Sequence, residues 1–181
     1  MAKANLALTF EQIDDAARAR LAARQARDTP DAPEPARAQA LAVLDRLGDE
    51  PGDLHTVLDH EPAPAWPAIV RDELTRWADL DPAERRAELD AWIDGQLAHG
   101  GRGPDLAEAW LGMLIELPPA AMQEIIRSCV DALGRREEDV QERFRFQVAR
   151  AMPRFPVPQF LRLGDMFNTI AEELGQKAAW R

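Results

Sequence analysis

The sequence is poor in the residues that carry out nucleophilic catalysis. Its 181 residues include one cysteine, one serine and no tyrosine. Ser128 and Cys129 are adjacent in a segment with helical spacing, where a hydroxyl usually bonds back to a carbonyl or faces solvent, and the apolar neighbours of Cys129 predict a buried, inert thiol. No Gly-x-Ser-x-Gly motif occurs. These absences argue against a serine or cysteine hydrolase, and a single cysteine excludes an internal disulfide. We therefore do not expect an enzyme.

Groups that bind metals or phosphate are also scarce. The chain has three histidines, and its helical segments lack the Glu-x-x-His motif of di-iron bundles. His55 and Asp59 are four residues apart, so one helical face can present both to a metal. The glycine-rich stretch at residues 99–104 has no Lys-Ser/Thr after it, unlike a phosphate-binding loop. The sequence predicts no cofactor, and a metal at His55 and Asp59 is kept as an alternative.

Long apolar runs are missing as well. The longest, around Trp110 to Ile115, is much shorter than the roughly 20 residues that cross a bilayer. The first residues lack the apolar core of a signal peptide. We expect a cytoplasmic protein that has no membrane partner.

Apolar residues recur three and four positions apart along the chain, which is the spacing of one helix face. Apolar and polar residues do not alternate over any long stretch, as they do in a strand. The clearest stripe consists of Met122, Ile125, Ile126, Cys129, Val130 and Leu133. Prolines and glycines separate such segments from one another. The pattern predicts an all-α fold, an irregular multi-helix bundle of roughly nine helices. Because residues 80–83 and 117–120 resemble each other at two helix starts, a short α-solenoid of helical hairpins is the alternative.

The first of these segments is expected to be a single helix over residues 9–28. Thr9 and Gln12 match a capping box, and Phe10, Ile13 and Leu21 recur at helical spacing. The remaining surface of this helix carries four arginines, namely Arg18, Arg20, Arg24 and Arg27. An isolated helix of this length is marginally stable in water, so its apolar stripe needs a surface to cover it.

Three prolines within residues 30–35 interrupt the chain after this helix. We therefore predict an N-terminal helical arm with a proline-rich linker at 1–30 and a helical core domain at 31–181. Charge differs along the chain, since residues 31–116 carry 19 acidic and seven basic side chains, a net charge of −12. An acidic core argues against nucleic acid or an anionic membrane as its partner.

Several apolar side chains are surplus to the predicted core and are candidates for contact with a partner. They are Phe10, Ile13, Leu21, Phe146, Phe155 and Trp180. The aromatic residues among them that lie in connectors and the tail can also fold back over the bundle. The sequence thus favours a non-catalytic interaction protein, such as an adaptor, an assembly factor or a small accessory subunit. Its partner is expected to be another protein chain or a second copy.

An arginine cluster in the C-terminal third supports an alternative, a regulator that binds nucleic acid. The cluster contains Arg135, Arg136, Arg143, Arg145 and Arg150. Acidic residues at ion-pair spacing, such as Asp139 before Arg143, favour a solvated helix face instead. A protein that binds a metal or a small ligand is the second alternative.

Overall fold

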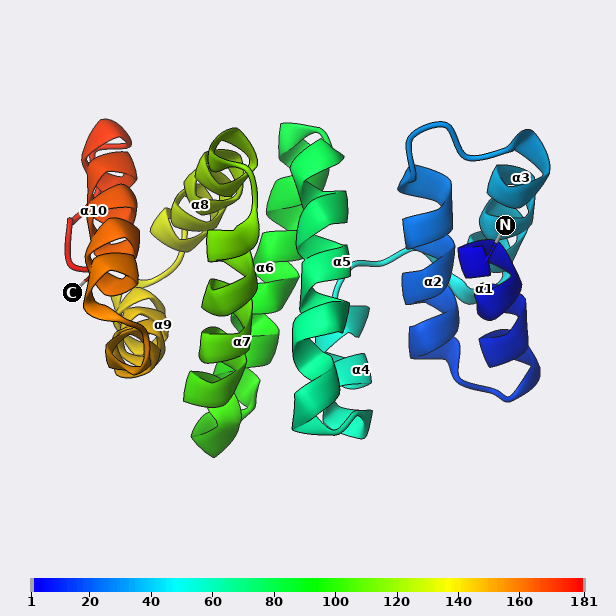
Figure 1. Cartoon of the computed structure of the whole chain (residues 1–181), viewed down its shortest axis with the longest axis horizontal. Coiled ribbons are helices and arrows are strands. Elements are labelled where there is room, and N and C mark those ends of the chain that lie inside the picture. Colours follow the sequence, from blue (N-terminus) through cyan, green and yellow to red (C-terminus); the bar gives the residue numbers. More distant parts are fainter. Residues whose placement is uncertain (1, 181) are drawn as a thin grey trace. The chain divides into compact units, whose positions relative to one another are not determined.

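The computed structural model describes residues 2–180, which form ten α-helices and no strand within that range (Figure 1). Three short 3-10 turns connect some of them. The helices are α1 (Ala2–Gln12), α2 (Ala16–Asp28), α3 (Glu34–Leu47), α4 (Asp53–His60), α5 (Trp66–Asp79), α6 (Pro82–Ala98), α7 (Gly103–Glu116), α8 (Pro119–Gly134), α9 (Glu138–Ala151) and α10 (Val157–Glu173). The predicted all-α fold is confirmed.

The extra helix arises at the N-terminus, where two helices replace the single one expected over residues 9–28. Asp14 adopts a left-handed backbone, with φ of 59°, which ends α1. The Asp15 side chain then accepts a hydrogen bond from the Arg18 backbone N–H at 3.1 Å and caps α2. Thr9 forms no capping box, because its hydroxyl donates to the Asn5 carbonyl within α1 at 3.0 Å.

The contacts divide the chain into two compact units, with unit 1 ending at Leu80 and unit 2 beginning at Asp81. Sequence reasoning places the boundary at residue 30 instead. In the structure, α1 and α2 pack within unit 1 and lie beside α3. The proline-rich segment therefore connects two helices of one unit, and whether residues 1–30 ever separate from it stays a prediction.

Helix α2 takes part in two apolar clusters of unit 1. In the first, α1, α2 and α3 share a core made mostly of alanines, which allow helices to approach closely. Its buried members are Ala4, Ala7, Ala19, Ala22, Ala23, Ala26, Ala36, Ala40, Val43 and Leu44. In the second, α2 contacts α4 and α5 through a smaller cluster of Ala17, Leu21 and Val57, against which Ile69 packs.

Unit 2 is built from helices that pack on the next helix but one. Helix α6 lies against α8, α7 against α9, and α8 against α10, an arrangement like the stacked hairpins of a short solenoid. Large aromatic side chains fill the interior. The rings of Trp92 and Trp110 are 6.1 Å apart, and those of Phe167 and Trp180 are stacked at 4.6 Å.

Between residues 2 and 180, no helix combines the length and the apolar character that a membrane span requires.

Candidate interaction groove

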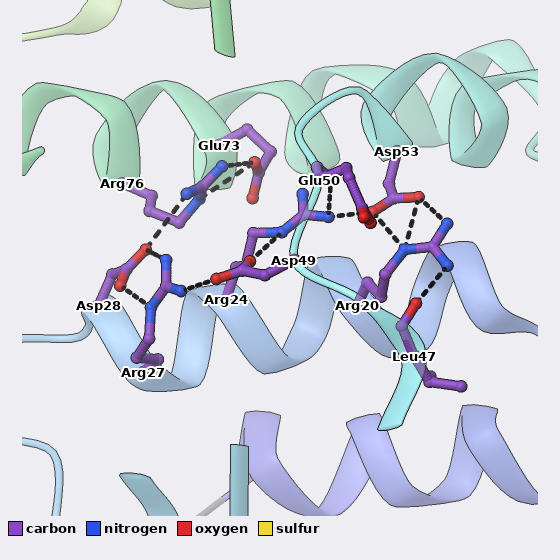
Figure 2. A network of polar contacts seen from close by, with 10 residues as sticks. All are labelled: Arg20, Arg24, Arg27, Asp28, Leu47, Asp49, Glu50, Asp53, Glu73 and Arg76. Atoms are coloured by element: carbon purple, nitrogen blue, oxygen red, sulfur yellow. Dashed lines mark hydrogen bonds and ion pairs between the residues drawn. The ribbon is translucent and has the colours of Figure 1, made fainter. Parts of the chain in front are cut away.

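The arginines of α2 are the main polar contact surface inside unit 1. Figure 2 shows Arg20 and Arg24 converging on Asp53 of α4. The Arg20 Nε donates to Asp53 Oδ2 at 3.0 Å, and this bond raises the pKa of the guanidinium. Arg24 also holds the connector before α4, with its Nε 3.1 Å from Asp49 Oδ1 and its Nη2 2.7 Å from the Glu50 carbonyl.

A second group of polar contacts ties the C-terminal end of α2 to α5 (Figure 2). The Arg27 Nε donates to Asp28 at 2.6 Å, and Arg76 donates to the same carboxylate at 3.2 Å. Arg76 also binds Glu73 at 2.8 Å. Gln25 of α2 donates to the other Glu73 oxygen at 2.6 Å. The two groups together join α2 to both later helices of the unit.

These charges are largely removed from water. Arg24 is 2% exposed, Asp53 6% and Glu73 1%. Burying a charge is costly unless it is paired and hydrogen-bonded. Because each of these side chains has charged partners, α2 is held in a single register against α4 and α5. Sequence reasoning predicts these arginines at the solvent surface, and this expectation is wrong for Arg24.

Beside this network the same helices form an apolar groove with a volume of about 200 Å³. Its apolar lining comes from Leu6 and Phe10 of α1, Leu21 and Ala22 of α2, Val57 of α4 and Ile69 of α5. Ion pairs cross its rim between residues far apart in sequence. The Lys3 ammonium is 3.2 Å from Asp72, and Arg18 is 2.7 Å from Glu61. The groove is thus an apolar hollow with charged edges.

Two of the predicted partner-binding residues line this groove, and a third does not. Phe10 is partly buried and lies beneath the Arg18 guanidinium, 5.9 Å from the ring centroid. Leu21 is 6% exposed at the base of the groove. Ile13 is 65% exposed in the turn between α1 and α2 and is not part of the lining. Leu6, which sequence reasoning missed, lines the groove and is 47% exposed.

The three predicted partner-binding residues of unit 2 differ in exposure. Phe146 is 62% exposed on α9, where the Arg150 guanidinium lies over its ring. Phe155 is partly buried, near Gly112 of α7. Trp180 is only 2% exposed. It stacks on Phe167, meets Phe144 edge-on, and donates its backbone N–H to the Asn168 side chain. The tail therefore folds back over the unit, and Trp180 is not available on its surface.

The five arginines of the nucleic-acid alternative have different surroundings. Arg136 binds Asp90 at 2.9 Å and also Asp94, and Arg145 is 8% exposed over the Trp180 ring. Burial lowers the pKa of Arg145. Arg135 and Arg143 are exposed but lie near Asp131 and Asp139, while Arg150 covers Phe146. Binding of nucleic acid by this set stays an untested alternative.

The predicted metal ligands and the single thiol are also defined by the structure. His55 is buried and Asp59 is exposed. Among residues 2–180, no three His, Cys, Asp or Glu side chains are grouped in a way that could hold a metal ion. Cys129 is completely buried in α8, and burial raises the pKa of its thiol to about 12. Such a thiol is protonated at neutral pH and is a poor nucleophile.

Comparison of the whole chain with protein-family models, with curated proteins and with solved structures found no match to any of the three.

Proposed function

We propose that this protein is a non-catalytic, cytoplasmic interaction protein, such as an adaptor, an assembly factor or a small accessory subunit. It binds another protein chain by receiving apolar side chains in the groove between α1, α2, α4 and α5. The observation that carries the proposal is the groove itself, an apolar hollow in a protein surface that is otherwise rich in charge.

The size of the groove favours side chains over a small-molecule ligand. Pockets that bind cofactors or drug-sized ligands usually enclose about 300–1,000 Å³, whereas this groove has about 200 Å³. A hollow of that size suits one or two large apolar side chains from a helix or loop of a partner. Amphipathic helices seated in apolar grooves are a recurrent mode of protein recognition.

The rim adds polar groups around the apolar base. Lys3 paired with Asp72 and Arg18 paired with Glu61 place both signs of charge among the residues that line the hollow. Rim charges of this kind mainly select partners and set association rates, while buried apolar contacts supply most of the affinity. Leu6 is the side chain best placed to meet a partner, because it is half exposed and belongs to the lining.

The proposal is tested by affinity capture with Leu6→Glu. A carboxylate at the groove mouth must be desolvated when an apolar side chain enters, so we expect the variant to lose partners that wild-type protein retains from native lysate. Circular dichroism checks that the variant keeps its helical content and melting temperature.

Leu161→Glu is the matched control. Leu161 is 43% exposed on α10 and lies in unit 2, outside the groove lining. The control should retain the partners that Leu6→Glu loses. Equal retention by both variants, or a selective loss with Leu161→Glu, would place the binding surface elsewhere and contradict the proposal.

A further inference from the structure

The connector between α3 and α4 has the backbone features of a hinge. It runs from Gly48 to Gly52 and contains Pro51. Both glycines have positive φ, 88° at Gly48 and 112° at Gly52, values that residues with a side chain rarely adopt. This short segment connects the three N-terminal helices to α4 and α5.

The surface joined across this connector combines apolar contacts with several ion pairs. The alanine-rich core shared by α1, α2 and α3 is distinct from the contact of α2 with α4 and α5, where a smaller apolar cluster lies beside the arginine network. The charges are complementary, because guanidiniums of α2 meet the carboxylates of Asp49, Asp53 and Glu61 from later segments. One pair has the opposite sense, since Asp28 of α2 binds Arg76 of α5. Interfaces of this kind resemble those between separate proteins more than a continuous core.

We propose that residues 2–47 exchange between two copies of this chain. The connector extends, α2 of one copy docks on α4 and α5 of the second copy, and the reciprocal docking closes the dimer. The contacts of Arg20 and Arg24 with Asp53, of Gln25 with Glu73 and of Asp28 with Arg76 are then formed between chains instead of within one chain. Exchange of an identical element is a low-cost route to a dimer, because no new complementary surface has to be created.

The exchange is independent of the proposed function. In the dimer each groove is assembled from α1 and α2 of one copy and α4 and α5 of the other, so its lining is unchanged. A partner can therefore bind either form. If the groove captures no partner, the exchange proposal is unaffected. If no exchange occurs, the proposed binding at the groove is unaffected.

The test uses two full-length charge-reversal variants, Arg24→Glu and Asp53→Arg. In each variant alone, like charges face each other across the interface, which lowers its melting temperature. In a mixture, an exchanged heterodimer contains one interface with both reversed residues and one with both native residues. We expect equimolar mixing to raise the melting temperature and to yield, by light scattering, a species with twice the mass of the 20.2 kDa chain.

The variant that carries both substitutions in one chain is the control. It should regain stability as a monomer, which shows that the reversed pair is compatible with folding. If this double variant is stable while the mixture contains only monomers with their separate melting temperatures, the proposal is overturned. Should the buried reversals prevent folding, Arg18→Glu with Glu61→Arg repeats the test at a pair whose side chains are 24% and 27% exposed.

A hinge variant gives a second, independent readout. Gly52 has a positive φ in the monomer, so Gly52→Ala strains the connector there. The extended connector of the exchanged dimer does not need this φ and is not strained. We expect the dissociation constant of the dimer to fall at least about tenfold relative to wild type. Gly101→Ala is the control, since Gly101 has no positive φ and no atom near the added methyl group. An unchanged dissociation constant for Gly52→Ala contradicts the hinge.

Discussion

At the scale of single residues, burial determines which side chains are available to a partner. Trp180 lies near the end of the chain in an otherwise irregular segment, yet it is 2% exposed. Phe146 lies within a regular helix and is 62% exposed. Position in a tail or a helix is therefore a poor guide to exposure, and the aromatic contacts decide it.

Replacement of Trp180 measures how firmly the tail is held. Trp180→Ala removes the stacking on Phe167 and the edge contact with Phe144, so we expect a loss of about 3 kcal/mol in the free energy of unfolding. Phe146→Ala is the comparison and should change it by less than about 0.5 kcal/mol, as for an exposed residue. Urea titrations followed by circular dichroism supply both values, and equal effects would mean that the tail does not pack as described.

Cys129 provides a chemical test of burial. Its pKa is raised to about 12 from an ordinary value of 9.0, so the folded protein keeps the thiol neutral. We expect no reaction with a thiol reagent at pH 8 in the native state and one equivalent of reaction in denaturant. A fast native reaction would contradict the closed core around α8.

The same shift has a consequence for stability. Because the folded pKa lies above the unfolded one, the neutral thiol favours the folded state, and that contribution is fully present below about pH 9. It is lost as the pH rises towards 12. Thermal melts of wild type and Cys129→Ala should therefore converge over this interval as the pH rises.

At the scale of secondary-structure elements, α2 combines an alanine face with an arginine face. Arg20, Arg24 and Arg27 recur at helical spacing, which places them on one side of the helix. This pattern is visible in the sequence and predicts a shared face. Arg20 and Arg24 find their acidic partners in later segments, at Asp49 in the connector and Asp53 in α4, so the sequence alone does not show that the face is buried.

Removal of one member of this network tests its structural role. Arg24→Met leaves the buried Asp53 with fewer positive partners, and breaking a buried ion pair in this way costs about 3–5 kcal/mol. Arg46→Met removes an exposed pair with Glu11 instead and should leave the melting temperature nearly unchanged. If both variants melt like wild type, the network does not hold α2 in place.

Helix boundaries show what sequence patterns reveal and what they miss. The start of α6 is readable, because Asp81 precedes Pro82, and the Asp81 carboxylate accepts the backbone N–H groups of Ala83 and Glu84 at 2.8 and 3.0 Å. The break between α1 and α2 cannot be read from the sequence. Apolar spacing runs through it, and the interruption depends on the left-handed backbone of Asp14, which few sequence signals mark.

For the molecule as a whole, the sequence predicts the all-α fold class, whereas the grouping of the helices depends on contacts that the sequence does not display. Prolines at residues 30–35 suggest a domain linker, but α1, α2 and α3 share one core, and the contacts divide the chain after Leu80. A shared core depends on contacts between distant segments, whereas proline content is local. The groove was missed for the same reason, since its lining comes from four helices between Lys3 and Asp72.

The net charge of −10 does not show which of the positive charges are available at the protein surface. Several of the cations of α2 are neutralised inside unit 1, so they offer little attraction to an external polyanion. An interaction protein that meets its partner through apolar side chains fits this distribution better than one that binds phosphates.

Site-specific photo-crosslinking tests whether another protein chain enters the groove at Leu6. A photoreactive amino acid replaces Leu6 in one preparation and Leu161 in another, and both are irradiated in native lysate. We expect a discrete crosslinked species from position 6 only, which an excess of unlabelled wild type suppresses and an excess of Leu6→Glu does not. Crosslinks of equal yield from both positions, or a species from position 6 that Leu6→Glu suppresses equally well, would contradict the proposed binding at the groove.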